Sequence, residues 1–199
     1  MKFPDIYQRL PGLVLGFHGC DESVGEDIFT DPKKHLDQSN NDYDWLGGGI
    51  YFWENDPQRA WEFAKEAAKN PRITKGKIKK PCVVGAVLDL GLCCNLLDRR
   101  ALDEIRESFD VLDVVFEALE EALPTNGKAR QARRLDCLVI ENMHKLRKRQ
   151  NIKEYDTVRG AFWEGGALYP GANIERMNHV QIAVRNKDCI KGYFRPRLL

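Results

Sequence analysis

The segment that most constrains this chain is a glycine run that leads into an aromatic strand and then into a helix. Gly47-Gly48-Gly49 allows a sharp turn or a close approach to a ligand, and Ile50-Tyr51-Phe52-Trp53 has the composition of a strand. Asp56 before Pro57 predicts a helix start, because aspartate accepts from first-turn N–H groups and proline fits the first helical position. We therefore expect a binding surface whose floor is this strand.

Further strands are predicted near both ends of the chain. Residues 13–20 alternate in character, which places Gly16 and His18 together on one face of a strand. Residues 179–186 alternate in the same way, and Gln181 lies on the face opposite to the apolar valines and isoleucine. The two segments give the chain a strand-rich beginning and end.

Helices are predicted between these strands. A long amphipathic helix follows Asp98, and its inward residues include Leu102, Val115 and Leu119. A second helix is expected from about residue 133 to residue 149.

Composition excludes several classes of protein. The 199 residues contain no linker-like stretch, so we predict a single domain over residues 1–199. The 31 basic and 30 acidic residues nearly cancel, which argues against a global attraction to nucleic acid or membrane. The six cysteines and four histidines lack ligand spacing, so no metal is expected. Without a signal peptide or an 18-residue apolar run, a cytoplasmic protein with no membrane partner is predicted.

Three short segments in this order resemble the ADP-ribosyltransferases of the diphtheria-toxin and poly(ADP-ribose) polymerase type. They are Gly16-Phe17-His18-Gly19, Gly49-Ile50-Tyr51-Phe52 and His179-Val180-Gln181-Ile182. The resemblance implies an α+β fold, a split β-sandwich of mostly antiparallel strands with flanking helices. Residues 181–185 and 190–194 resemble the late strand and the closing strand of the same transferases. The chain is also similar to a widespread uncharacterised bacterial family with the same Phe-His-Gly-Cys-Asp and Cys-Ile-Lys-Gly-Tyr-Phe segments.

The resemblance also implies that NAD is the substrate and assigns the residues that bind it. His18 is expected to hold a ribose hydroxyl, and the backbone of Gly19 to reach the carboxamide of nicotinamide. Tyr51 is expected to stack on the nicotinamide ring, which contributes ~1 kcal/mol beyond burial. Gly49 and Phe52, which lie on either side of Tyr51 in the sequence, are expected to belong to the same NAD-binding surface.

The chain departs from the family pattern at Gln181, where glutamate is often present. An amide can accept a hydrogen bond from a ribose hydroxyl but cannot take a proton or stabilise a cation by charge. Single transfer is therefore expected and polymer elongation is not. An alternative is that Gln181 is a polar residue on the exposed face of an edge strand. Glu164, between an aromatic residue and two glycines, is the preferred carboxylate on the acceptor side, ahead of Glu54 and Asp44.

Other parts of the NAD site are assigned by position. Asp44 and Tyr43, with Asn41 and Asp42, form a loop expected over the adenosine half of NAD. Three arginines are candidate pyrophosphate partners, because guanidinium binds phosphate with two hydrogen bonds: Arg159, Arg185 and Arg195.

Three functions follow from these expectations. The first is NAD-dependent mono-ADP-ribosyl transfer to a protein or nucleic acid with release of nicotinamide; basic segments near Lys77 and Arg133 would dock a nucleic-acid acceptor. The second is an NAD glycohydrolase, a toxin or defence effector that an inhibitory partner protein could silence. The third is a non-catalytic module that binds NAD or ADP-ribose.

Overall fold

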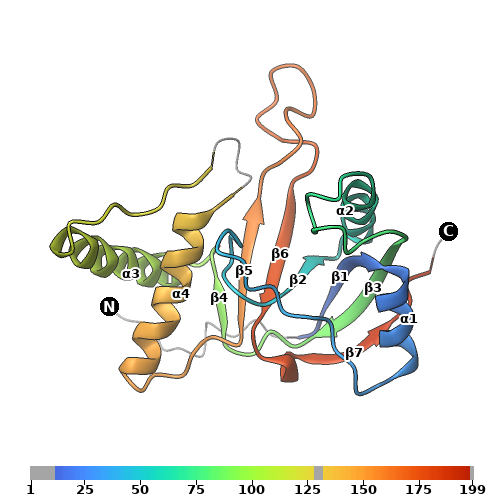
Figure 1. The fold of residues 1–199 in the computed structure, drawn as a ribbon, viewed down its shortest axis with the longest axis horizontal. Coiled ribbons are helices and arrows are strands. Elements are labelled where there is room, and N and C mark those ends of the chain that lie inside the picture. The colour runs from blue at the N-terminus through green and yellow to red at the C-terminus, as the bar shows by residue number, and fades with distance from the viewer. Residues whose placement is uncertain (1–11, 128–131, 198–199) are drawn as a thin grey trace.

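A computed structural model describes residues 12–127 and 132–197 (Figure 1). Four α-helices are present in this part: α1 (Glu22–Thr30), α2 (Pro57–Lys69), α3 (Arg99–Ala118) and α4 (Arg134–Arg149). The strands are β1 (Val14–Asp21), β2 (Ile50–Glu54), β3 (Pro81–Leu88), β4 (Cys93–Asn95), β5 (Thr157–Phe162), β6 (His179–Val184) and β7 (Ile190–Phe194), and the short 3-10 helix η3 (Lys187–Cys189) precedes β7. None of the described helices is long and apolar enough to cross a membrane.

The strands form one seven-stranded sheet with the order β4-β5-β6-β2-β1-β3-β7. The β4–β5 pair is parallel and the other pairs are antiparallel, so the α+β class and the mostly antiparallel sheet are confirmed. Hydrogen bonding joins all seven described strands into one sheet, where the resemblance implied a split sandwich. The joint between β1 and β2 is narrow, with pairing at Gly16↔Glu54 and Phe17↔Trp53.

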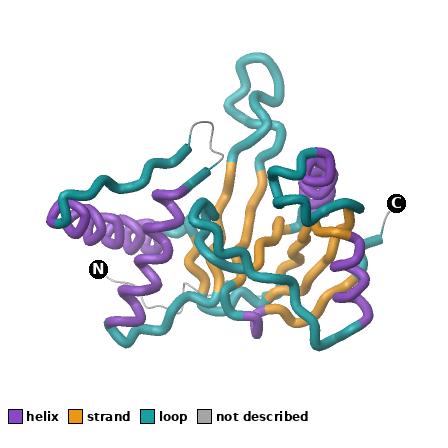
Figure 2. The backbone as a smooth tube through the Cα atoms, viewed as in Figure 1, coloured by secondary structure: helices purple, strands orange, loops and turns teal. Residues whose placement is uncertain are grey.

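The register assigns each side chain to a face of the sheet, because directly opposite residues in neighbouring strands share a face. His18 and Phe52 lie on the face that packs under α1, together with the largest apolar cluster. Tyr51 and Gln181 lie on the other face. That face is covered by α2 at one side and by α3 and α4 at the other (Figures 1 and 2).

The helix after the aromatic strand forms as predicted. The Asp56 carboxylate accepts a hydrogen bond from the backbone N–H of Arg59, and Pro57 occupies the first turn. Ala60, Ala64 and Ala67 are fully buried, so the small-residue stripe brings α2 close to the sheet. A Cβ atom at Gly19 would lie 2.3 Å from the carbonyl oxygen of Ala60, so only glycine permits this approach.

Gly19→Ala is therefore expected to destabilise the protein by about 1–3 kcal/mol, the usual cost of forcing extra atoms into a packed region. Gly192→Ala is the matched control, because a Cβ on this strand residue meets nothing within 4 Å. Urea unfolding of both variants measures the effect. Equal midpoints for the two variants would contradict the close packing of α2 on β1.

Two sequence expectations about helices were wrong or incomplete. Helix α1 was not among the predicted helices. On α3 the buried residues are Ala101, Ser108 and Leu112. Three residues expected inward are exposed: Leu102, Val115 and the C-cap Leu119. Ser108 instead donates through its hydroxyl to the carbonyl of Val139 on α4, at 2.8 Å. The inward face of α3 therefore differs from the face with the most apolar residues.

Candidate functional site

The pairing between β1 and β2 opens at Gly19. The carbonyl of Leu15 accepts from the backbone N–H of Asn55 at 2.8 Å, so Leu15 directs its backbone polar groups toward β2. Alternate residues of a strand point their N–H and C=O groups to the same side, so Phe17 and Gly19 do likewise. In the described part of the chain, β1–β2 pairing ends at Phe17↔Trp53. Gly19 therefore directs its backbone N–H and C=O toward the position where the next backbone hydrogen bonds of the β1–β2 pair, to Tyr51, would form.

The His18 ring occupies part of this opening. Its Nδ1 lies 2.7 Å from the carbonyl oxygen of Tyr51. A carbonyl can only accept, so Nδ1 carries the proton and Nε2 keeps its lone pair. Burial lowers the pKa of His18 below its ordinary value, against the smaller effect of the hydrogen bond to Tyr51. His18 is thus a neutral imidazole with a defined tautomer beside the backbone of Gly19.

The side chain of Tyr51 serves the glycine loop. Its hydroxyl donates to the carbonyl of Gly47 at 2.7 Å and accepts from the N–H of Leu46 at 3.0 Å. Burial, and secondarily the negative charge of Asp44, raise the pKa of Tyr51. Because His18 and Tyr51 project from opposite faces of the sheet, the structure does not bring their side chains together as two walls of one cleft.

Gln181 is buried in the middle of the sheet. Strand β6 has β5 and β2 as neighbours, and the residue is 6% exposed, so the edge-strand alternative was wrong. The indole Nε1 of Trp45 donates to Oε1 of Gln181 at 2.6 Å. Trp45 in turn stacks on Phe162, with ring centroids 3.7 Å apart. Gln181 is therefore held by a tryptophan from the loop that Tyr51 fixes.

Glu164 lies beside two residues that the sequence did not single out. Its carboxylate pairs with Nη2 of Arg59 at 2.9 Å, and it lies 3.9 Å from Nδ1 of His179. Arg59 comes from the first turn of α2, and His179 is the first residue of β6. The available signal for His179 was its position two residues before Gln181, which puts both on the same face of the strand.

The predicted adenosine loop lines a cavity on the other side of the glycine run. Asn41 and Asp42 face α4 across a cavity of about 800 Å³ that Glu141, Lys145 and Arg185 also line. Asp44 closes the loop by accepting from the backbone N–H of Asn41 at 3.0 Å. The carbonyl of Tyr43 accepts from the backbone N–H of Arg133 at 3.3 Å. This loop is thus attached to α4, away from the opening at Gly19.

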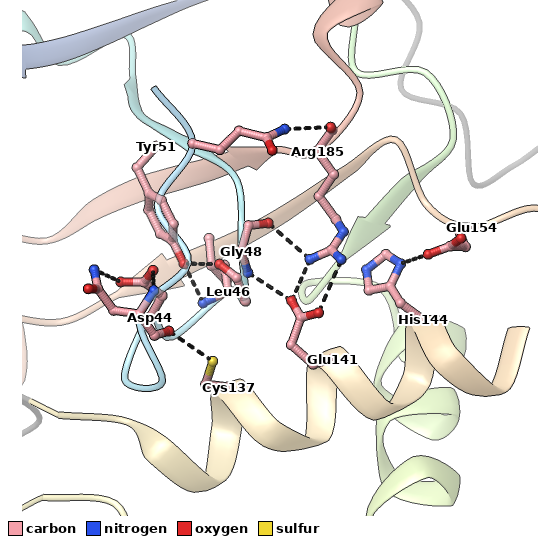
Figure 3. A network of polar contacts seen from close by, with 12 residues as sticks. Asp44, Leu46, Gly48, Tyr51, Cys137, Glu141, His144, Glu154 and Arg185 are labelled. Atoms are coloured by element: carbon pink, nitrogen blue, oxygen red, sulfur yellow. Dashed lines mark hydrogen bonds and ion pairs between the residues drawn. The ribbon is translucent and has the colours of Figure 1, made fainter. Parts of the chain in front are cut away.

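A polar network connects the cavity to the tyrosine (Figure 3). Glu141 accepts from the backbone N–H of Gly48 at 2.8 Å and from Nη1 of Arg185 at 2.6 Å. Arg185 also donates to the carbonyl of Gly48 at 2.9 Å. The pairing with Arg185 and the bond from Gly48 lower the pKa of Glu141, although burial opposes them. The network and the Tyr51 hydroxyl together fix residues 46–48.

The other candidate residues have structural partners. Each candidate arginine forms an ion pair with a carboxylate: Arg159 with Glu54 at 2.6 Å, Arg185 with Glu141 and Arg195 with Glu26 at 2.7 Å. Gly49 exchanges backbone hydrogen bonds with Ser39, and Phe52 is fully buried. Of the basic segments, residues 128–131 lie outside the described residues, and the Arg133 guanidinium lies over the Trp45 ring at 5.0 Å.

Comparisons of the chain with protein-family models, with curated proteins and with solved structures found no match. What this site can do therefore rests on its own residues and their geometry.

Proposed function

We propose that this protein is an NAD-dependent mono-ADP-ribosyltransferase that transfers ADP-ribose to a protein or nucleic-acid acceptor and releases nicotinamide. The observation that carries the proposal is the opening of the sheet at Gly19, next to the neutral His18 ring and one strand away from β6, which carries Gln181. That reaction requires contacts to the leaving group and to the sugar, and the Gly19 backbone and the His18 ring can provide them.

The backbone of Gly19 suits the carboxamide of nicotinamide. A carboxamide has one carbonyl acceptor and an NH₂ donor, and it pairs with a strand that offers one N–H and one C=O on the same side. The lone pair on Nε2 of His18 can accept from a ribose hydroxyl. Gln181 supplies an amide rather than a charge, which suits the transfer of one unit without elongation.

A binding module for NAD or ADP-ribose is the second candidate. The Trp45 indole already donates to Oε1 of Gln181 at 2.6 Å, so this oxygen has a protein partner. A site in which the Gln181 oxygen is occupied in this way could recognise the nucleotide without breaking its glycosidic bond.

The decisive experiment incubates the purified protein with cell extract and NAD labelled in the adenylate phosphate. We expect a labelled macromolecule and released nicotinamide, both reduced at least tenfold by His18→Gln and by Gln181→Ala. His35→Gln is the control, because this exposed histidine contacts Tyr193 on β7, away from the opening. Digestion of the product by protease or nuclease identifies the class of acceptor.

The other outcomes assign the alternatives. Nicotinamide release without labelling would identify an NAD glycohydrolase. A rise in melting temperature with NAD but no product would identify the binding module, since a ligand stabilises the state that binds it. With neither a product nor a thermal shift, the NAD proposal is rejected.

A further inference from the structure

A second group of polar atoms lies beside Gln181, on the same face of the sheet. It consists of Trp53 at the end of β2, Arg59 in the first turn of α2, and His179 at the start of β6. The Arg59 guanidinium lies 5.5 Å from the centre of the Trp53 ring, and the rings of Trp53 and His179 are 6.4 Å apart. Glu164 joins the group through its ion pair with Arg59. Three separate elements and one loop thus contribute to one cluster.

Several buried atoms of this cluster have no hydrogen-bond partner in the described part of the chain. They are the indole Nε1 of Trp53, Nε and Nη1 of Arg59, and Nε2 of His179. Leaving a buried polar group unpaired is costly, so a cluster of such atoms is a candidate site for a group that supplies the missing bonds. The indole and guanidinium nitrogens are donors.

The unpaired nitrogen of His179 is an acceptor. Its Nδ1 lies 2.7 Å from the carbonyl oxygen of Met177, which can only accept, so the proton is on Nδ1 and Nε2 has a lone pair. Burial is the main cause that lowers the pKa of His179, so the ring is neutral near pH 7. The charged groups around it are Glu164 from the β5–β6 loop and Arg59 and Asp56 from the start of α2.

The chemistry of the cluster fits a hydroxyl group. An O–H accepts from donors such as the Trp53 indole and the Arg59 guanidinium, and it donates its own proton to an acceptor such as Nε2 of His179. A carboxylate has no proton to give, and an ammonium group has no lone pair to offer. His179 and Gln181 are two residues apart on one strand face, about 7 Å, which places an oxygen bound here beside the amide of Gln181.

We propose that Trp53, Arg59 and His179 form the subsite for the attacking oxygen, and that Nε2 of His179 accepts its proton. This inference rests on the proposed function and names the missing base of that reaction, since Gln181 cannot take a proton. The nucleophile is an O–H group, from water or from a hydroxyl side chain of the acceptor. The partly exposed Glu164, in its ion pair with Arg59, lies at the outer edge of the cluster.

The bond between C1′ of the ribose and nitrogen of nicotinamide breaks, and its electron pair leaves with neutral nicotinamide. A lone pair of the attacking oxygen forms the new bond to C1′. The proton of that oxygen passes to Nε2 of His179 and then to water, so the products are ADP-ribosylated hydroxyl or free ADP-ribose, nicotinamide and one proton.

The test compares His179→Gln with the wild-type protein in single-turnover nicotinamide release over pH 4 to 9. We expect release to slow about 100-fold, within the usual contribution of general base catalysis, while the thermal shift produced by NAD is retained. Wild-type activity should fall below an apparent pKa lower than 6.5, because protonated His179 cannot accept, and the residual rate of the variant should keep only the acid limb that protonation of His18 produces. His35→Gln controls for the loss of a histidine.

The outcomes separate this inference from the proposed function. If wild-type protein releases nicotinamide and His179→Gln keeps both the rate and the acid limb, the subsite is wrong and the function stands. If wild-type protein shows no NAD-dependent thermal shift and no release, both are rejected. If His179→Gln does not fold, Trp53→Phe keeps a ring but removes an unpaired donor: a rate at least fivefold slower supports the subsite, and an unchanged rate overturns it. Label on a macromolecule shows that a hydroxyl side chain of the acceptor attacks, and free ADP-ribose shows that water attacks.

Discussion

Acidification from pH 7 to pH 4 is expected to remove about 3 kcal/mol of stability through His144 alone. This residue of α4 is 1% exposed, and neither of its ring nitrogens has a hydrogen-bond partner in the described structure. Burial, with help from the positive charges of Arg185 and Arg147, lowers the pKa of His144 to about 3. The unfolded chain binds a proton near the ordinary value of about 6.5. Stability is therefore complete above pH 6.5 and lost progressively between pH 6.5 and about pH 3.

His144→Leu tests this expectation. Leucine removes the titrating group and two unpaired buried nitrogens, so the variant should be at least as stable as wild type at pH 7. The difference in unfolding free energy between variant and wild type should then grow by about 3 kcal/mol on going to pH 4. Urea unfolding at several pH values measures it, and His35→Leu at an exposed position is the matched control. A difference that does not change with pH would show that His144 is protonated in the folded protein.

Tyr51→Phe is expected to cost about 2–6 kcal/mol, although it removes a single oxygen atom. The hydroxyl bonds two buried backbone groups, the N–H of Leu46 and the carbonyl of Gly47, and each unpaired group costs about 1–3 kcal/mol. For a chain of this length the melting temperature should fall by about 4–24 °C, at about 2–4 °C for each kcal/mol. The same change loosens the loop that carries Trp45, which holds Gln181.

Tyr193→Phe is the matched control for this variant. The Tyr193 hydroxyl also accepts from a backbone N–H, that of Leu36, but at 3.4 Å, and its other contact is with the exposed His35. Its loss should cost less than the loss of the Tyr51 hydroxyl. Equal costs for the two variants would show that Tyr51 does not fix the glycine loop. Differential scanning calorimetry of both proteins decides the question.

Local signals predicted those elements whose causes are local. The helix after Asp56 is encoded by its cap and by the adjacent proline, and both act within one turn. The alternation in β1 and β6 predicted which residues of each strand share a face, such as Gly16 with His18 and Gln181 with Ala183. Helix α1 was missed because it has nine residues, a length at which contacts with the sheet decide more than propensity does.

Long-range pairings could not be predicted in the same way. Apolar periodicity placed Val115 and Leu119 inward, yet the end of α3 extends away from the sheet (Figure 1), so these side chains are exposed. The hydrogen bond from Trp45 to Gln181 joins residues 136 positions apart, and no pattern within either segment specifies it. The ion pair of Arg59 and Glu164, 105 positions apart, is of the same kind.

The short pairing between β1 and β2 is the weakest connection between neighbouring strands in the middle of the sheet. Two residue pairs connect β1 to β2, whereas eight connect β1 to β3 and four connect β2 to β6. The sheet therefore has two parts, β4-β5-β6-β2 and β1-β3-β7, which are joined by a short β1–β2 pairing. A ligand that bonds to Gly19 on β1 and to β2 would add hydrogen bonds between these two parts. Binding of such a ligand would therefore strengthen the junction between β1 and β2, and the resistance of the sheet to unfolding at this junction would rise when the site is occupied.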